Sequence, residues 1–396
     1  MKILMVTPYL PYPPASGGQI RTFNLLKYLS KKNDIILVSL YKTDQEKKYV
    51  SHLEEYCEKV YLCKRSENPW QPSNILRSVF SLQPFLIVRN FSPEARKVIE
   101  TLLQEHEFDV IHSETFYVMP HIPETTVPTL LVEQTIEFRV YQHFIETLPW
   151  FFKLFLSLDI SKLRYSEKHY WKKATLVATV SDLDRTIVSN IEPTINPIVI
   201  PNGAGEDMLV PSLEKKDFKE VKLLFQGNFS WLQNVEAADY LINEIYPILK
   251  KRFPKIKLII AGQHAKKIEK TGDVSYVTIG NDDAGTVKRL YTEATIFIAP
   301  IFGPGGTRLK ILAAMASGLP VISTKTGVEG LDVKEGRDVL FANTPQKFAE
   351  KIGKILSDKR LYNQIRENAW ELVKKKYNWE KIAQRLEVAY QKIQTS

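Results

Sequence analysis

Cysteine is scarce in this sequence, since Cys57 and Cys63 are the two present among 396 residues. Two cysteines are too few for a disulfide framework or a cysteine-rich metal site, so we expect both to pack as small hydrophobic side chains in a reducing compartment. Long apolar runs are also lacking, because none reaches the ~18 uncharged residues that a membrane-spanning helix needs. The first apolar run, KILMVT (2–7), is too short for a secretory signal and leads into prolines. These absences predict a cytoplasmic protein.

Acidic residues are in deficit, because 54 Lys and Arg outnumber 45 Asp and Glu and give a formal net charge of +9. A basic balance suits an anionic ligand, a nucleic acid or an anionic membrane surface. No DNA- or RNA-binding motif accompanies this charge, so we expect no nucleic-acid partner. Solvated lysine faces such as VKKKYNWEK (373–381) account for much of the excess.

Metal- and dinucleotide-binding signatures are missing as well. The seven histidines show no ligand spacing, and DLD (182–184) follows Ser181, a residue type that often caps the start of a helix. We therefore predict a helix start there and expect no metal. The fingerprint G-x-G-x-x-G is absent, which argues against a dinucleotide-dependent dehydrogenase, and we expect no cofactor.

Short apolar runs alternate with amphipathic segments, and the pattern occurs twice. In the first half we predict a helix over about residues 19–30 and strands at KILMVT (2–7), DIILVSL (34–40), DVIHSE (109–114), TLLVEQ (129–134) and ATLVATVS (174–181). After a charged linker we predict a helix over residues 234–253 and strands at VKLLFQGN (221–228), IKLIIAG (256–262), VSYVTIG (274–280), ATIFIAP (294–300) and LPVIST (319–324).

This alternation predicts an α/β fold of two doubly wound domains, over residues 1–200 and 201–375. The last segment, 376–396, is predicted to be a helix that docks back on the first domain. Ligands of doubly wound sheets bind outside the carboxyl ends of the strands.

The stretch GPGGTRLKILAAMASGLPVIST (303–324) is typical of a phosphate-binding loop that leads into a helix. Gly305 and Gly306 allow close backbone approach, Thr307 is a plausible N-cap, and Arg308 and Lys310 fall in the first helical turn. Cations there are unfavourable unless an anion is bound, because the first-turn N–H groups already carry partial positive charge. We expect a diphosphate at this position; the alternative is a surface helix that merely begins with basic residues.

A similar element, PASGGQIRTF (14–23), starts a helix in the first domain, with Gly17 and Gly18 before it and Arg21 in its first turn. Polar residues also end two predicted strands, His112 and Glu114 at the first and Glu133 and Gln134 at the next. These are positions where a doubly wound fold exposes side chains to a ligand. The alternative for such strand-end residues is a satisfied hydrogen bond without a chemical role.

The segment LPWFFKLFLSLDISKLRYSEKHYWKK (148–173) is both aromatic and basic. Phe151, Phe152, Phe155 and Leu158 fall on one helical face, which is typical of a helix that lies on an anionic bilayer. A buried helix of the first domain is an equal alternative.

Together these motifs, with SDLDRTIVSN (181–190), VIPNG (199–203), LLFQGNFSWLQNVEAADYL (223–241) and YNWEKI (377–382), resemble the retaining GT-B glycosyltransferases of family four. The resemblance covers nearly the whole chain. It implies that the C-terminal domain binds a nucleotide-sugar and the N-terminal domain presents the acceptor, with no metal.

Carried over by position, the resemblance assigns donor contacts to three places in the second half and one in the first. The donor-binding positions are Gly17, Gly18, Gly227, Asn228, Gly305, Gly306, Thr307, Glu329, Gly330 and Leu331, with Arg308 and Lys310 as candidate diphosphate ligands. Glu114, next to His112, falls where relatives keep a His or Glu facing the reacting sugar, so both are catalytic candidates. Glu133 and Gln134 are assigned to the acceptor side.

The sequence departs from the family pattern at several of these positions. Gly305 and Ala313 stand where many relatives have two glutamates that bind the donor sugar and the ribose, and Glu329 is our candidate to replace the second. Relatives often have a basic pair in the turn that reads GNFSWLQN (227–234) here. Glu133–Gln134–Thr135 stands in place of Glu-His-Asn.

The resemblance implies a metal-independent, retaining glycosyltransferase. It would move sugar from a nucleotide-diphosphate sugar to an envelope polysaccharide, lipopolysaccharide or lipid-linked acceptor on the inner face of the plasma membrane. The alternative is a GT-B scaffold protein that has lost turnover and partners an active transferase.

Overall fold

The computed structural model describes the chain except for residues 206–207, 215, 217, 269–271 and 395–396 and the side chains of Phe152, Leu154 and Phe155. The chain divides into two compact units, Met1–Pro201 with Glu380–Ser396, and Asn202–Trp379. The first boundary lies one residue beyond the expected one, and the C-terminal segment joins the first unit at Glu380. None of the described helices combines the length and the apolar character needed to cross a membrane.

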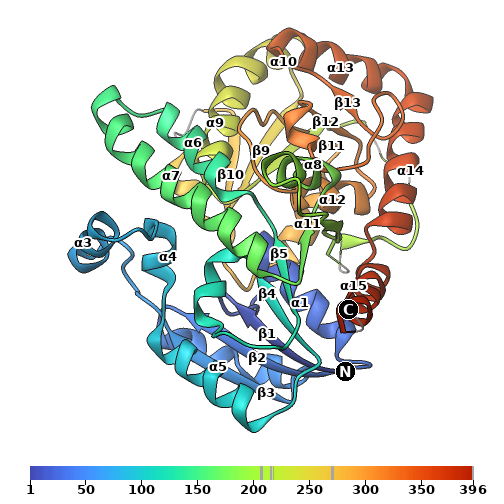
Figure 1. Ribbon diagram of the computed structural model, residues 1–396. Helices are drawn as coiled ribbons and strands as arrows, with labels where there is room; N and C mark the ends of the chain where they lie inside the picture. The colour runs from blue at the N-terminus through green and yellow to red at the C-terminus, as the bar shows by residue number, and fades with distance from the viewer. Residues whose placement is uncertain (206–207, 215, 217, 269–271, 395–396) are drawn as a thin grey trace. The chain divides into compact units, whose positions relative to one another are not determined.

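The first unit is built on a parallel sheet of seven strands in the order β3-β2-β1-β4-β5-β6-β7 (Figure 1). Its strands are β1 (Lys2–Thr7), β2 (Asp34–Tyr41), β3 (Lys59–Lys64), β4 (Val110–Glu114), β5 (Thr129–Glu133), β6 (Leu176–Thr179) and β7 (Ile198–Val199). Its helices are α1 (Gly17–Leu29), α2 (Ser51–Glu54), α3 (Pro72–Phe80), α4 (Phe85–Asn90), α5 (Pro93–Glu105), α6 (Glu137–Glu146), α7 (Trp150–Lys173) and α8 (Asp182–Ile191), with 3₁₀ turns η1 (Asp44–Tyr49) and η2 (Phe116–His121).

The second unit repeats the plan with a parallel sheet in the order β10-β9-β8-β11-β12-β13. Its strands are β8 (Lys222–Gln226), β9 (Lys257–Gly262), β10 (Val274–Thr278), β11 (Ile296–Ala299), β12 (Val321–Ser323) and β13 (Leu340–Phe341). Its helices are α9 (Leu232–Tyr240), α10 (Tyr246–Arg252), α11 (Ala284–Glu293), α12 (Leu309–Ala316), α13 (Pro345–Ser357) and α14 (Lys359–Lys376), with short turns η4 (Leu241–Ile245), η5 (Ala265–Lys267) and η6 (Thr326–Val328). The last helix, α15 (Trp379–Gln394), begins at the boundary between the units.

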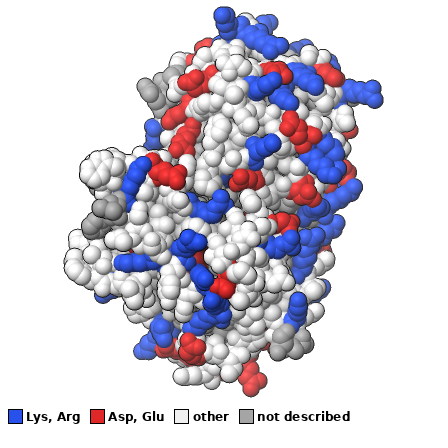
Figure 2. Space-filling view, turned by 45° about the horizontal axis from the view of Figure 1, so that its top comes forward, with Lys and Arg blue, Asp and Glu red and all other residues white. Residues whose placement is uncertain are grey.

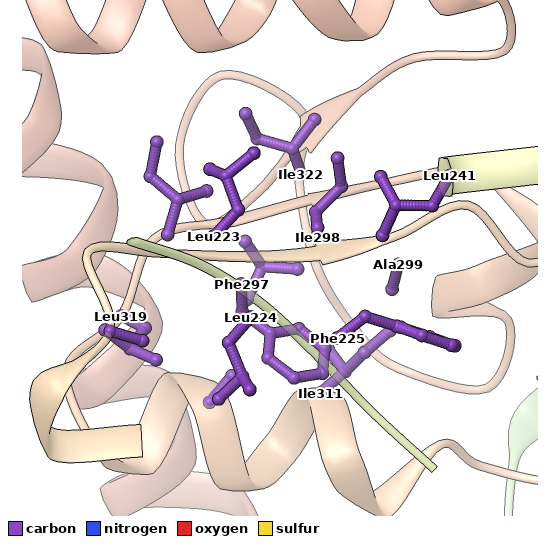
Figure 3. Packing of buried hydrophobic residues seen from close by; sticks show 14 of the residues in the cluster. Leu223, Leu224, Phe225, Leu241, Phe297, Ile298, Ala299, Ile311, Leu319 and Ile322 are labelled. Carbon is purple, nitrogen blue, oxygen red and sulfur yellow. The ribbon is translucent and has the colours of Figure 1, made fainter. Parts of the chain in front are cut away.

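The apolar runs form strands because both faces of each sheet are covered, so a continuous hydrophobic stretch is buried on either side. Figure 3 shows this in the second unit, where Leu223, Leu224 and Phe225 of β8 lie among side chains of β11, β12 and α12. All ten predicted strands are confirmed. The sequence analysis missed β3, β7 and β13, of which two contain only two residues each.

Three predicted helix starts and one continuous helix can be compared directly with the structure. The Ser181 hydroxyl accepts a hydrogen bond from the Asp184 N–H at 3.0 Å, so the predicted N-cap is confirmed. Helix α1 begins at Gly17 rather than near Gln19. The helix predicted over residues 234–253 is two α-helices joined by the wider π-helical turn η4. The N-cap of α12 is Arg308, so the prediction of Thr307 as N-cap was wrong.

Candidate functional site

The second sheet has a point where its strand order reverses, between β8 and β11. These two strands are hydrogen-bonded neighbours, but the chain continues from β8 to β9 on one side and from β11 to β12 on the other. The loops that follow such strands diverge and leave a crevice at their carboxyl ends, where ligands of this architecture bind. The turn at Gly227–Asn228 and the loop 300–308 both leave the sheet at this point.

Gly227 lies in the turn after β8, where a larger residue would press on the side chains of Lys310 and Asn234. A Cβ there would lie 3.0 Å from Lys310 Nζ and 3.0 Å from Asn234 Cγ. The turn is held by the Gly227 N–H, which donates to Ala261 O at 3.0 Å, and by Asn234 Nδ2, which donates to Asn228 O at 2.7 Å. The glycine thus leaves room for the ammonium group of Lys310 beside the turn.

Lys310 comes from the start of α12 and extends back towards β8. Its Nζ donates a hydrogen bond to Asn234 Oδ1 and lies 5.0 Å from the centre of the Phe225 ring. Burial, and then the positive charge of Arg308, lower the pKa of Lys310 to about 7. No acidic side chain is among these partners, so an anion bound here would raise that pKa and hold the ammonium form. Lys310 Nζ thus lies beside the turn 227–234, which has no basic residue of its own in this sequence.

Arg308 shapes the loop before α12. Its Nη2 donates to Gly303 O at 2.8 Å, and a Cβ on Gly305 would lie 2.1 Å from Nη1. The glycine at this position therefore lets the guanidinium fold over its own loop. Thr307 Oγ1 is buried and has no hydrogen-bond partner within the described residues, which leaves a hydroxyl donor in the same loop.

The loop after β12 is tied to the loop after β11. Thr324 Oγ1 donates to Ile301 O, and the same oxygen accepts from the Gly327 N–H at 2.8 Å. At the strand ends, Ser323 Oγ donates to Ala299 O at 2.8 Å. The turn Glu329–Gly330–Leu331 follows, with Gly330 at a φ of 81°, a left-handed conformation that glycine adopts without strain. Glu329 is partly exposed at this edge of the sheet, whereas Ala313 packs against the core.

The first unit holds a buried polar network at the carboxyl end of β4. Glu114 Oε1 accepts from His112 Nε2 at 3.0 Å and from Arg21 Nε at 3.4 Å, and Oε2 accepts from Gln134 Nε2 at 2.5 Å. Tyr9 donates its hydroxyl hydrogen to Gln134 Oε1 at 3.2 Å. Burial alone would raise the pKa of Glu114, but Arg21, His112 and Gln134 overcome this and lower it to about 2. The carboxylate is therefore ionised at neutral pH.

Helix α15 completes this network from the far end of the chain. The Tyr390 hydroxyl contacts His112 Nδ1, and both side chains are fully buried. Because His112 Nε2 faces a carboxylate, it carries a hydrogen, and the tyrosine fixes the other ring nitrogen. The sequence analysis gave no signal for this pairing, nor for the roles of Tyr9, Asn234 and Gln263, whose side chain accepts from Asn228 Nδ2.

At the start of α1 the structure shows what Arg21 and Gly18 contact within the first unit, and the assignment of Gly17 and Gly18 to donor binding stays a prediction. Arg21 is fully buried; its Nη1 donates to Ile200 O at 3.2 Å and Pro201 O at 3.1 Å, besides the ion pair with Glu114. Gly18 is needed because a Cβ would lie 1.5 Å from Tyr9 Oη. Gly17 is exposed. Gly18 thus serves packing around Tyr9, and Arg21 serves the buried network.

Glu133 and Gln134, the two acceptor-side candidates, occupy different environments. Glu133 is fully buried and accepts from Trp171 Nε1 at 2.7 Å, and burial raises its pKa well above the usual range. Gln134 is partly exposed and bonded to Glu114. Of the pair, Gln134 is the one whose side chain can reach a solvent-borne molecule.

Comparison with known proteins shows which family the second unit is similar to. Residues 220–358, from just before β8 to just after α13, match the family model described as glycosyl transferases group 1. A solved structure of sucrose-phosphate synthase from Thermosynechococcus elongatus superposes with a TM-score of 0.73 at 15% identity, covering 99% of both chains. The chain has the GT-B fold, and its second unit is similar to the group 1 glycosyl transferases over the matched residues. The carboxyl ends of β8 and β11, Lys310 and the loop 303–308 lie within the matched residues.

Two further proteins align with this GT-B chain over almost its whole length. An uncharacterized 44.6 kDa protein in the cps region of Klebsiella pneumoniae is 24% identical, covering 96% of this chain and 97% of that protein. HepE from Anabaena, solved in complex with UDP-glucose, has a TM-score of 0.63 at 15% identity and covers 99% of this chain and 100% of that one. The structural likeness at this identity concerns the fold.

Proposed function

We propose that the chain transfers a sugar, with retention of configuration and without a metal, from a nucleotide-diphosphate sugar to an envelope polysaccharide, lipopolysaccharide or lipid-linked acceptor. The observation that carries the proposal is the position of Lys310. Its ammonium group lies beside the Gly227 turn at the switch point of the second sheet, with a lowered pKa and with no acidic partner among the described residues. Partial burial of a cation without a counter-ion is unfavourable, and a bound diphosphate would supply that counter-ion.

The proposed mechanism places the charge of the leaving group on the second unit. As the bond between the sugar and the diphosphate breaks, negative charge develops on the departing phosphate oxygen. Lys310, the Thr307 hydroxyl and the start of α12 would stabilise that charge. The acceptor hydroxyl forms the new bond to the same face of the sugar, and its proton passes to the leaving phosphate. Positive charge from the protein would then stabilise the leaving diphosphate, as a bound metal ion does in other transferases.

For the first unit we propose that Gln134 contacts the acceptor or the transferred sugar and that Glu114 positions it. The Glu114 carboxylate is fully buried, whereas its partner Gln134 is partly exposed. The Glu114 carboxylate is ionised and held by three partners, so it accepts a hydrogen bond from the Gln134 amide and keeps that side chain in one orientation. His112 in turn orients Glu114, which makes both of these candidates positioning residues.

The nature of the donor and acceptor is proposed from the relatives. HepE was solved with UDP-glucose, which makes UDP the first nucleotide to test. The Klebsiella relative is named for its place in a cps region, which supports a capsular or other surface polysaccharide as acceptor. A cytoplasmic location, on the inner side of the plasma membrane, follows from such an acceptor.

The proposal is tested by measuring thermal stability with UDP, GDP, ADP and dTDP, then with the sugar derivatives of the best nucleotide. A ligand that binds only the folded protein raises its stability by mass action, by about 2.7 kcal/mol at a hundredfold excess over Kd. We expect one nucleoside diphosphate to stabilise the chain and its sugar derivative to be consumed with a polysaccharide or lipid-linked acceptor. If no nucleotide stabilises the protein, the donor site is misplaced.

The scaffold alternative rests on Ala313, which cannot accept a hydrogen bond from ribose. It predicts that a nucleotide-sugar binds and is neither transferred nor hydrolysed by the isolated chain. Nucleotide stabilisation without turnover on any acceptor would favour this alternative over the enzyme.

A further inference from the structure

Helix α3 in the first unit buries polar side chains and exposes apolar ones, the reverse of an ordinary surface helix. Asn74 and Ser78 are buried, whereas Ile75, Leu76 and Val79 are exposed. The exposed face continues through Phe80 and Leu82, which are 84% and 87% exposed. A surface helix normally turns its apolar stripe towards the core, whereas α3 presents its apolar stripe to the solvent.

Hydrogen bonds from the buried polar side of α3 hold the helix in this orientation. Asn74 Nδ2 donates to Ser66 Oγ at 3.0 Å and to Pro69 O at 3.1 Å. Ser78 Oγ donates to Asp159 Oδ1 at 3.2 Å, and Lys162 Nζ donates to Ser78 O at 2.7 Å. The polar side of α3 is thus attached to α7, and the apolar side is held outward.

The first turns of α7 extend the same kind of surface. Trp150, Phe151 and Leu158 are exposed there, and Trp70 is exposed just before α3. The second half of α7 is different, because Leu163 and Trp171 belong to the core. The second half of the segment 148–173 is therefore a buried helix, whereas the first half is exposed and its contact with a bilayer stays a prediction. The side chains of Phe152 and Phe155 lie outside the described residues.

The charge on these two segments is of one sign. Between Asn68 and Pro93 the sequence has no Asp or Glu, and Arg77 of α3 is positively charged. Between Leu148 and Leu158 the sequence also has no Asp or Glu, and Lys153 is positively charged. In Figure 1, α3 and the α6–α7 pair project to the same side of the first unit. Figure 2 shows lobes at its left edge with few charged side chains, whereas Lys and Arg are scattered among acidic residues elsewhere on that view.

We propose that this surface, the α3–α7 face (Trp70, Ile75, Leu76, Val79, Phe80, Leu82, Trp150 and Phe151), docks onto an anionic lipid bilayer. Projecting helices with aromatic and aliphatic tips can enter the boundary between headgroups and acyl chains, while Arg77 and Lys153 meet anionic headgroups. A bilayer accepts such convex elements without a complementary groove. The face stands on the geometry of the first unit alone, so its test is separate from any test of sugar transfer.

The decisive experiment is vesicle flotation with the full chain. Vesicles of phosphatidylglycerol and phosphatidylethanolamine are compared with vesicles of phosphatidylcholine, at low and high salt. We expect the protein to float with the anionic vesicles and to be partly released by salt. The triple variant L76S/F80S/L82S should lose binding by roughly a hundredfold or more, because each large side chain that leaves the acyl boundary removes about a factor of ten.

The matched control is Val388→Ser, which changes a side chain of 64% exposure on α15, outside the α3–α7 face. It should float like the unmodified protein. Because all the altered side chains are exposed, the variants should unfold at the same temperature as the parent, and this is checked first.

A second readout is quenching of tryptophan fluorescence by brominated lipid, which should diminish in W70F and W150F. Three outcomes would overturn the proposal: no flotation of the unmodified protein, flotation of the triple variant equal to that of the Val388 control, or no quenching on binding. A dimer in sedimentation that the triple variant abolishes, together with failure to float, would assign the face to a second copy of the chain instead.

Discussion

The proposed donor site depends most on a single side chain, Lys310. The sequence shows only that a cation follows a glycine-rich loop at the start of a helix. In the structure its ammonium group lies against the Phe225 ring and beside Gly227, where burial and Arg308 disfavour its charge. Residues whose charged form is disfavoured until a ligand binds are typical of functional sites.

Replacing Lys310 by Met should weaken binding of UDP by about 1.5–3 kcal/mol and leave uridine binding nearly unchanged, because a charge-assisted contact to phosphate is lost. The affinity of the unmodified protein should fall as pH rises above about 7, since the folded-state pKa of Lys310 is about 7 and binding then requires proton uptake. In the absence of ligand the sign is opposite: a lowered lysine pKa makes charged Lys310 unfavourable, so stability rises with pH from about 7 towards the unfolded value of 10.5.

Calorimetry of UDP binding in buffers of different ionisation enthalpy measures this proton uptake directly. The control is Lys288→Met, which changes an exposed lysine on α11. Equal losses for UDP and uridine, or a pH profile that survives in Lys310→Met, would remove Lys310 from the phosphate site.

Glu329 is the candidate acceptor for the ribose hydroxyls, because Ala313 has no polar atom in its side chain. We expect Glu329→Ala to weaken UDP binding by roughly 1.5–3 kcal/mol, the range for a hydrogen bond to a charged group, and Ala313→Glu to change it little. Titration with 2′,3′-dideoxy-UDP is the control, because it lacks the hydroxyls and should not distinguish Glu329→Ala from the parent. Tighter binding by Ala313→Glu, with no effect of Glu329→Ala, would show that nothing has replaced the missing glutamate.

Two glycines near the starts of helices should respond to alanine in opposite ways. Gly18→Ala places a Cβ 1.5 Å from Tyr9 Oη, so we expect a loss of about 1–3 kcal/mol in the free energy of unfolding. Gly285→Ala in α11 meets nothing within 4 Å and should stabilise by about 0.4–1 kcal/mol. Urea denaturation of both variants measures the difference; a neutral Gly18→Ala would mean that Tyr9 moves aside freely.

At the scale of elements, the residue patterns of helices α15 and α3 do not show which parts of the chain these helices contact. Helix α15 is joined to the second unit but belongs from Glu380 to the first, where Tyr390 contacts His112 and Asn33 donates to Glu387 Oε1 at 3.3 Å. Helix α3 is attached through its polar side. In each case a partner that is distant in sequence, rather than the pattern of the helix itself, determines how the helix is oriented.

Tyr390→Phe should destabilise the chain by about 1–3 kcal/mol, because the variant leaves His112 Nδ1 buried without its hydroxyl partner. Thermal or urea unfolding measures this cost. Tyr165→Phe is the matched control, since Tyr165 is exposed on α7, and should stay within about 0.5 kcal/mol of the parent. If the two variants unfold alike, the contact between α15 and β4 contributes nothing to stability.

At the scale of the molecule, the two units have separate sheets and separate hydrophobic cores. A ligand held by the second unit should therefore protect that unit's loops selectively. With saturating UDP, we expect amide hydrogen exchange to slow over residues 227–231 and 303–313, while β1, β2 and β4 of the first unit keep their rates. Protection confined to residues 9–21 or 112–134 would move the donor site to the first unit.

The sequence by itself determined the elements whose signal is local. Buried parallel strands need continuous apolar runs, so VKLLFQ and KILMVT predict their own structure, and the alternation of such runs with helices predicts two doubly wound sheets. The glycine-rich loop before α12 was also visible, because turns and helix starts depend on a few neighbouring residues. Ser181 capped its helix as predicted for the same reason.

The tertiary structure alone decided which polar groups meet. His112 and Tyr390 are 278 positions apart, and Asn234 and Lys310 are 76 apart, so no pattern within one element links them. The sequence places Arg21 in the first turn of a helix and does not show its partners, which are the Glu114 carboxylate and the carbonyl oxygens of Ile200 and Pro201. The outward face of α3 was hidden for a related reason: its spacing shows an apolar stripe, and only the hydrogen bonds of Asn74 and Ser78 decide which way that stripe points.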